Sequence, residues 1–277
     1  MGAVAALAHQ SSVTLAEHPP PKIDGRPIHI GAKNCAFAGR TAWALYESGK
    51  AKSFEMVDIP LGHDRPTWLR DMNPSNTVPV VLDANGQRLP GNSASLAALL
   101  LDDANSTDEF VLEAVHEFDT QAVGPLYAFL RCTAPHGSDS WVSARTRVEH
   151  ALARVEACFV RAAAARRCAG NEDNDGPYFC GGSLSLADIA IVSVLWRFDA
   201  SLRAFRGYDE LVSPERTPLL SRAVHACAAR DAFRAATPSA DQIVAFYRDD
   251  AAYCPDLPSP GLDAWVDRML AGTQPVP

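Results

Sequence analysis

The amino-acid sequence predicts two unlike parts, a small α/β domain followed by an all-helical domain. Between residues 26 and 101, short apolar runs typical of strands alternate with segments of helical periodicity. Beyond residue 108, apolar residues recur at three- and four-residue spacing and strand-like runs are missing. The polar segment 102–108 separates the two patterns and predicts a linker. We therefore expect domains at 26–101 and 109–254.

The expected elements of the first domain follow the order βαβαββα. A strand at 28–30 leads into a helix from Ala36 to Ser48, which Gly49 would end from the C′ position. The remaining elements are a strand at 54–59, a short helix at 66–72 that starts with proline, a hairpin of strands at 78–82 and 87–89 around Asn85-Gly86, and a helix at 94–101 capped by Ser93.

Five segments of the second domain predict helices. They lie at 109–130, 143–166, 185–205, 218–230 and 240–248. Ser185 and Asp188 have the spacing of a capping box, with Asp in place of Glu, and predict a role in folding. Residues 1–25, rich in Ala, Ser, His and Pro, are expected to be a disordered tail, and residues 255–277 to be a Pro-rich C-terminal tail.

Composition excludes several classes of protein. The net charge of -8 and the lack of a dense Lys/Arg stretch argue against a nucleic-acid partner. No apolar run approaches the ~20 residues of a membrane span, and the first residues lack a targeting pattern. Seven widely spaced cysteines without a CxxC pair predict reduced thiols in the cytoplasm. The histidines show no metal-ligand spacing, so no metal is expected.

Cys35 is the candidate nucleophile. It stands where the strand at 28–30 passes through a turn into a helix. The free N–H groups and the positive dipole of a helix N-terminus favour the reactive thiolate, and Lys33 adds a cation nearby. The alternative is a small buried hydrophobic residue without chemistry.

A second motif is the segment from Asn73 to Leu82, which contains Val78-Pro79. A cis Val78–Pro79 bond would turn the Val78 backbone outward, leaving its N–H and C=O free to pair with an extended peptide. The alternative is a trans proline at the start of a strand, which base rates favour because only about one X–Pro bond in twenty is cis.

Taken together, these motifs resemble the glutathione transferases. The resemblance runs through residues 26–101 and resumes at 183–190, and Cys35 followed by Ala-Phe is most similar to the cysteine-type classes (omega, lambda and dehydroascorbate reductase). It implies a thioredoxin-like first domain, an all-α second domain and a cis Val78–Pro79 bond. Members of the family are often dimers, so a homodimer is also expected.

The resemblance implies glutathione as co-substrate, with Cys35 catalytic and with Phe37, Val78, Pro79, Asn92 and Ser93 at the glutathione site. The chain departs from the family twice. Asn92 stands at the position where the family usually has a Glu that holds the ligand ammonium. Ala36 replaces the usual proline.

The expected activity is glutathione-dependent thiol transfer or reduction of a small disulfide or electrophilic substrate, through a mixed disulfide at Cys35. Position 38 is Ala, so a second glutathione would resolve that disulfide. Dehydroascorbate reduction and deglutathionylation both fit this chemistry. The alternative is a glutathione-transferase-like module that binds its ligand or senses redox state without catalysis.

Overall fold

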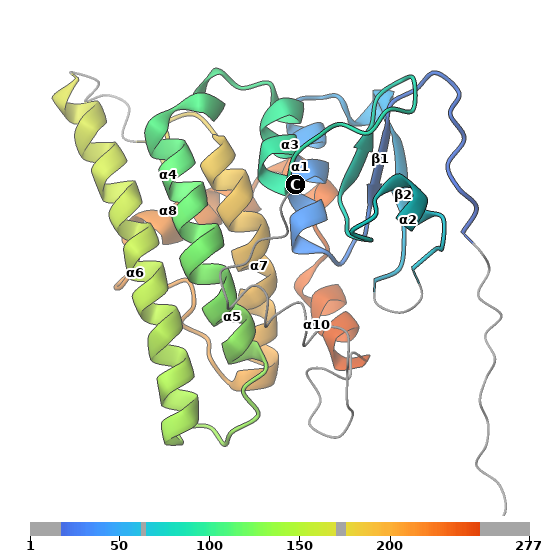
Figure 1. Cartoon of the computed structure of the whole chain (residues 1–277). Helices are drawn as coiled ribbons and strands as arrows, with labels where there is room; N and C mark the ends of the chain where they lie inside the picture. Colours follow the sequence, from blue (N-terminus) through green and yellow to red (C-terminus); the bar gives the residue numbers. More distant parts are fainter. Residues whose placement is uncertain (1–17, 62–64, 170–175, 250–277) are drawn as a thin grey trace, which may run out of the picture.

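A computed structural model of the chain describes residues 18–61, 65–169 and 176–249. It contains a small sheet with helices, followed by a helical domain, as predicted. Helices α1 (Ala36–Glu47) and α3 (Ser93–Leu101) lie between the sheet and the helical domain (Figure 1). The predicted tails fall largely outside the described residues, which begin at His18 and end at Asp249.

Three strands form the sheet, β1 (Ile28–Gly31), β2 (Glu55–Asp58) and β3 (Val80–Leu82), in the order β2-β1-β3. Strand β1 is parallel to β2 and antiparallel to β3, with Ile30 opposite Val80. Because β1 and β3 run in opposite directions, the end of β1 lies beside the start of β3. The segment after β1 and the segment before β3 therefore meet at one edge of the sheet.

The predicted fourth strand at 87–89 is reduced to a single bridge between Leu82 and Arg88. The hairpin itself is present. Its turn contains Gly86 with a positive φ of 79°, and Leu89 N donates to Val81 O at 2.8 Å. Pro90 follows and has no N–H to continue the ladder, so pairing stops there.

The remaining elements of this domain match the prediction with three corrections. Gly49 follows α1 with a φ of 72°, as expected of a C′ glycine. Helix α2 (Leu69–Met72) starts three residues later than predicted, and a short 3₁₀ helix, η1 (Ala51–Ser53), precedes β2. The cap of α3 is Asn92 and not Ser93, because Asn92 Oδ1 accepts from the N–H groups of Ala94 and Ser95, both at 3.0 Å.

The two faces of the sheet pack against different helices. Ile28 and Ile30 belong to a buried cluster that includes Leu69 of α2. On the opposite face, the fully buried ring of His29 lies 2.7 Å from Thr41 Oγ1 of α1. Burial lowers the pKa of His29 to about 4, so this imidazole is neutral in the folded protein.

The helical domain contains the five predicted helical segments and one that was not predicted. Its elements are the 3₁₀ turn η3 (Ala104–Thr107) within the predicted linker, α4 (Glu109–Glu117), the π-helical turn η4 (Phe118–Ala122), α5 (Val123–Leu130), α6 (Asp139–Cys168), α7 (Leu186–Arg206), α8 (Pro218–Ala228), α9 (Asp231–Ala236) and α10 (Ala240–Asp249). The unpredicted helix is α9, which spans only six residues.

The predicted capping box starts α7. Asp188 accepts from the N–H and the hydroxyl of Ser185, both at 2.8 Å, and from the N–H of Phe179 at 2.8 Å. Burial raises the pKa of Asp188 to about 6, against the opposing effect of these hydrogen bonds. The box therefore joins the start of α7 to the loop before it.

A buried acid from one helix also caps another. Glu156 of α6 accepts from the backbone N–H groups of Leu219 and Leu220 at 2.9 and 2.8 Å. These two groups belong to the first turn of α8, where the helix offers them no internal acceptor. The contact fixes α6 against α8.

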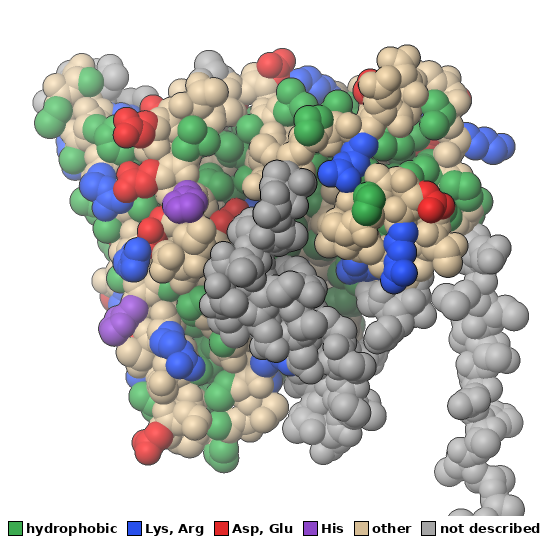
Figure 2. Space-filling model, in the orientation of Figure 1, with side chains coloured by type: hydrophobic (Ala, Val, Ile, Leu, Met, Phe, Trp, Pro, Cys, Tyr) green, Lys and Arg blue, Asp and Glu red, His purple; other side chains and the backbone are tan. Residues whose placement is uncertain are grey.

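The surface is mixed in character. Figure 2 shows Lys and Arg side chains scattered among acidic and apolar ones over the described part of one face. Among the described helices, none combines the length and the apolar character needed to span a membrane.

Candidate functional site

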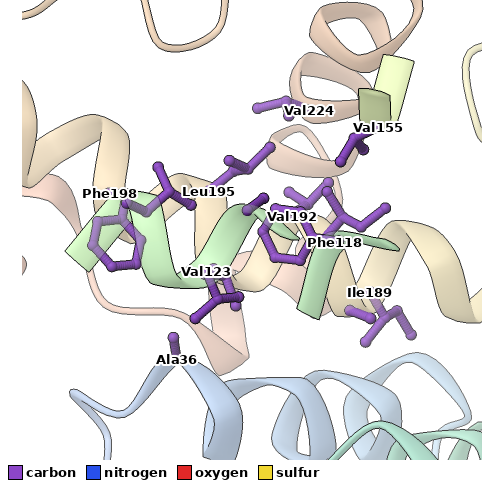
Figure 3. Packing of buried hydrophobic residues seen from close by; sticks show 14 of the residues in the cluster. Ala36, Phe118, Val123, Val155, Ile189, Val192, Leu195, Phe198 and Val224 are labelled. Atoms are coloured by element: carbon purple, nitrogen blue, oxygen red, sulfur yellow. The ribbon is translucent and has the colours of Figure 1, made fainter. Parts of the chain in front are cut away.

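Cys35 is the N-cap residue of α1, with φ of -88° and ψ of 118°. Its N–H donates to Ala32 O at 2.8 Å, which closes the turn between β1 and the helix. The half-buried thiol makes no capping hydrogen bond. The next residue, Ala36, is buried and points toward Val123 of α5 (Figure 3). The thiol therefore lies at a helix N-terminus where the two domains meet.

Arg65 is a site residue that the sequence analysis missed. Burial lowers the pKa of its guanidinium, and an electrostatic contribution from Cys35 acts in the opposite direction. Arg65 donates to the backbone oxygen of Asn76, and its Nε is buried without an acceptor. A lone arginine before Pro66 was the only sequence signal.

Arg197 was also missed. It belongs to α7, yet its Nη2 donates to the backbone oxygen of Lys33 at 3.4 Å, two residues before Cys35. Only 2% of Arg197 is exposed, and its Nε and Nη1 have no acceptor. The available signal was a charged residue inside the stretch 189–198 of a predicted helix, which is otherwise apolar except for Ser193.

The Val78–Pro79 bond is cis, as the resemblance implied. Val78 is buried and Pro79 is half-buried, and both immediately precede β3. Since β1 and β3 are antiparallel neighbours, this segment and the turn that carries Cys35 lie at the same edge of the sheet.

The start of α3 is joined to α1 through Arg40. The guanidinium donates to Ser93 Oγ at 3.2 Å, to both carboxylate oxygens of Asp119 at 3.0 and 2.5 Å, and to Ala190 O at 2.9 Å. Arg40 is 1% exposed and lies over the half-buried ring of Phe37, 5.0 Å from its centre. One side chain thus connects α1, α3, η4 and α7.

Asn92 differs from the other predicted site residues. It is exposed, and its Oδ1 already accepts from two backbone N–H groups and from the Ser95 hydroxyl at 3.3 Å. This oxygen is therefore occupied by the helix start.

The site combines the Cys35 thiol, the guanidinium groups of Arg65 and Arg197, and the backbone of Val78-Pro79. Cys35 and Val78-Pro79 lie at one end of the sheet, and Arg65 donates to the Asn76 backbone oxygen just before Val78. Ser93 is linked to the same helix as Cys35 by Arg40. Such a site can hold an anionic ligand beside a nucleophilic sulfur. Within the described ranges, no three acidic, His or Cys side chains cluster so as to hold a metal ion.

Two family models match this chain. The N-terminal domain of glutathione S-transferases matches residues 34–100, and the C-terminal domain matches residues 141–236. The matches follow the order of the two structural domains.

The chain is also similar to individual proteins and solved structures. Protein IN2-1 homolog B from Oryza sativa subsp. indica is 29% identical over 199 residues, which cover 67% of this chain and 70% of the relative. Among solved structures, the trimeric glutathione transferase TDR1 of Leishmania is 21% identical with a TM-score of 0.65, over 89% of this chain and 51% of that one. Glutathione transferase Omega 2C from Trametes versicolor is 19% identical with a TM-score of 0.59, over 81% and 97%.

The likeness to the solved structures concerns the fold, and this chain spans about half the length of the Leishmania protein. The two domain matches, in the family's own order and on the family's fold, place the chain in the glutathione transferase-like family.

Proposed function

We propose that this protein is a glutathione-dependent thiol transferase or reductase that uses Cys35 as its nucleophile. The observation that carries the proposal is the position of Cys35, a thiol at the N-terminus of α1 that makes no capping hydrogen bond. The Arg65 guanidinium is within electrostatic range of it, because Cys35 raises the pKa of Arg65 against the effect of burial. Both the helix dipole and the cation stabilise a thiolate. The thiolate is the form that attacks a disulfide.

The reaction would run in two exchanges. The Cys35 thiolate attacks the glutathione sulfur of a glutathionylated substrate, so that a mixed disulfide forms at Cys35 and the substrate leaves as a thiolate. A second glutathione thiolate then attacks the glutathione sulfur of this mixed disulfide. Oxidised glutathione leaves and the Cys35 thiolate is restored. Position 38 is Ala, which supplies no internal thiol for the second step.

Glutathione would lie along the edge of the sheet, with its backbone paired to Val78 and one carboxylate near Ser93 at the start of α3. Ser93 Oγ accepts from Arg40, so its hydroxyl hydrogen is available to a carboxylate. Phe37 and Pro79 would flank the same ligand. Dehydroascorbate reduction and deglutathionylation are the activities that we expect to find first.

The test is a glutathione-dependent disulfide-reduction assay with 2-hydroxyethyl disulfide. We expect Cys35→Ser to lower the rate by at least about a hundredfold, because the nucleophile is removed. Cys168→Ser, which changes an exposed thiol near the end of α6, is the matched control and should retain the wild-type rate. Equal rates for wild type and Cys35→Ser would refute the proposal.

A second candidate, a binding module without catalysis, is favoured by Asn92. Its oxygen is engaged in capping α3, and it lacks the negative charge that a ligand ammonium prefers. Isothermal titration with millimolar glutathione separates the two candidates. Binding without turnover would support the module, whereas an absence of binding would exclude both.

A further inference from the structure

Arg197 is a buried cation without a matching anion among the residues that the structure describes. Three of the five N–H donors of its guanidinium, one on Nε and two on Nη1, have no acceptor. The remaining contact, from Nη2 to Lys33 O, is long at 3.4 Å and ends on a neutral oxygen. Leaving a guanidinium buried and underbonded lowers the stability of a protein, which makes such a residue unusual in a purely structural role.

The position of Arg197 points to the second substrate. It reaches the loop before Cys35 from α7, in the helical domain. Lys33 and Cys35 are two residues apart, so their Cα atoms are at most ~7 Å apart. A group bound to Arg197 would therefore lie within a small molecule's length of the thiol.

The charges around this loop strengthen the case. Lys33 is exposed, and Cys35 raises the pKa of the Arg65 guanidinium against the effect of burial. The Asp58 carboxylate accepts from the backbone N–H of Lys33 at 2.6 Å. Arg197 forms no salt bridge with the described acids, in a chain whose net charge is -8. The loop is thus locally cationic.

We propose that Arg197 determines specificity by binding an anionic group, such as a carboxylate, on the second substrate. The inference rests on the proposed function for its biological meaning, since Cys35 is the group that the substrate must reach. An anionic group would replace the long bond to Lys33 O with shorter, charge-assisted bonds. Anionic disulfides and electrophiles would then react faster than their neutral isosteres.

The test uses two alkylating probes that differ in charge, iodoacetate and iodoacetamide. In both reactions the Cys35 thiol first ionises and gives its proton to water. The thiolate then forms a carbon–sulfur bond, and iodide leaves with the electron pair of the carbon–iodine bond. Mass spectrometry of the peptide that contains Cys35 gives the two rates separately from those of the other cysteines. No glutathione is needed, so the result is independent of the turnover assay.

We expect the ratio of the iodoacetate to the iodoacetamide rate at Cys35 to exceed that of free 2-mercaptoethanol. Arg197→Gln should lower the ratio by about tenfold, the size of one hydrogen bond to a charged group. Arg197→Lys should retain part of the preference. Arg203→Gln, on the same helix and exposed beside Asp199, should leave the ratio unchanged.

Two results would overturn the inference. One is an equal fall of both rates in Arg197→Gln, which would mean that Arg197 only positions the loop. The other is a wild-type ratio no higher than that of 2-mercaptoethanol, which is decisive even if Arg197→Gln fails to fold. If Cys35→Ser loses turnover but Arg197→Gln leaves the iodoacetate-to-iodoacetamide ratio at Cys35 unchanged, the proposed function is retained and the role of Arg197 is rejected.

Discussion

At the C-terminal end of α1, the Glu47 carboxylate and the Arg230 guanidinium are paired. Arg230 donates from Nε to Glu47 Oε2 at 3.0 Å and from Nη2 to Glu47 Oε1. Its Nη1 donates to the Tyr178 hydroxyl at 2.8 Å. Trp43 Nε1 donates to the same carboxylate at 3.2 Å. This end of the helix is thereby joined to the loop before α7 and to the start of α9.

At the N-terminal end of the same helix, polar groups are left without partners. The Cys35 thiol caps no N–H group, and both Arg65 and Arg197 hold donors that lack acceptors. The two ends differ in what they can do. Paired groups stabilise the joint between the domains, whereas unpaired groups keep their capacity to bind a ligand.

The largest effect on this comparison should come from Arg40, in the second turn of α1. Arg40→Met would leave Asp119 and Ser93 without their cation, which makes the middle of the helix as incomplete as its N-terminal end. We expect the free energy of unfolding to fall by about 4 kcal/mol, because a buried pair loses one partner. Urea unfolding measures the change. The exposed Arg26 pairs with Asp24, and Arg26→Met should have little effect.

The next effect is a pH dependence from His29, under the middle of α1. Its pKa is about 4 in the folded protein and near 6.5 when unfolded, so the unfolded chain binds the extra proton between these values. Stability from His29 is therefore complete above pH 6.5 and is lost as the pH falls toward 4, by up to about 3 kcal/mol.

The measurement is urea unfolding of wild type and His29→Gln between pH 4 and 7. Asp188 acts with the opposite sign, since its pKa is raised to about 6 and its contribution fades as the pH rises through that value. Subtracting the two curves cancels the Asp188 contribution. A difference that does not change with pH would contradict the neutral, buried state of His29.

Glu47→Gln tests the paired end directly. It would weaken the bonds from Arg230 and Trp43, and we expect the free energy of unfolding to fall by about 2 kcal/mol. Turnover per folded molecule should not change, because the site lies at the other end of the helix. Glu113→Gln, which alters an exposed pair with Arg161, is the control and should change stability much less.

The smallest effect concerns Asn92. Asn92→Ala removes the cap of α3 and should lower stability by about 1 kcal/mol, whereas Asn92→Asp should keep the cap. Isothermal titration with glutathione then separates the two roles of this residue. Tighter binding in Asn92→Asp would indicate a contact with the ligand ammonium, and unchanged binding would restrict Asn92 to capping.

Most of the fold could be predicted from the sequence because it follows from local patterns. The glycine that ends α1, the Asn85-Gly86 turn and the Ser185–Asp188 box are each specified by adjacent residues, and all three are present. The fourth strand was overpredicted because the effect of Pro90 on pairing depends on the neighbouring strand.

The site was predictable only where the chain itself marks it. Cys35 and the cis Val78–Pro79 bond belong to recognisable motifs, and their common location follows from the pairing of β1 with β3. The contacts of Arg65 with Asn76 O and of Arg197 with Lys33 O could not be predicted. Arg197 contacts a loop 164 residues earlier in the chain, and no local pattern encodes such a contact.

The cap that Glu156 provides for α8 has a consequence for how the chain assembles. The first turn of α8 obtains acceptors for the Leu219 and Leu220 amides only from α6, across more than sixty residues of chain. Local fraying of α8 cannot release these amides while the two helices stay docked. Their exchange with deuterated solvent should therefore report separation of α6 from α8, which makes them a built-in probe of assembly in the helical domain.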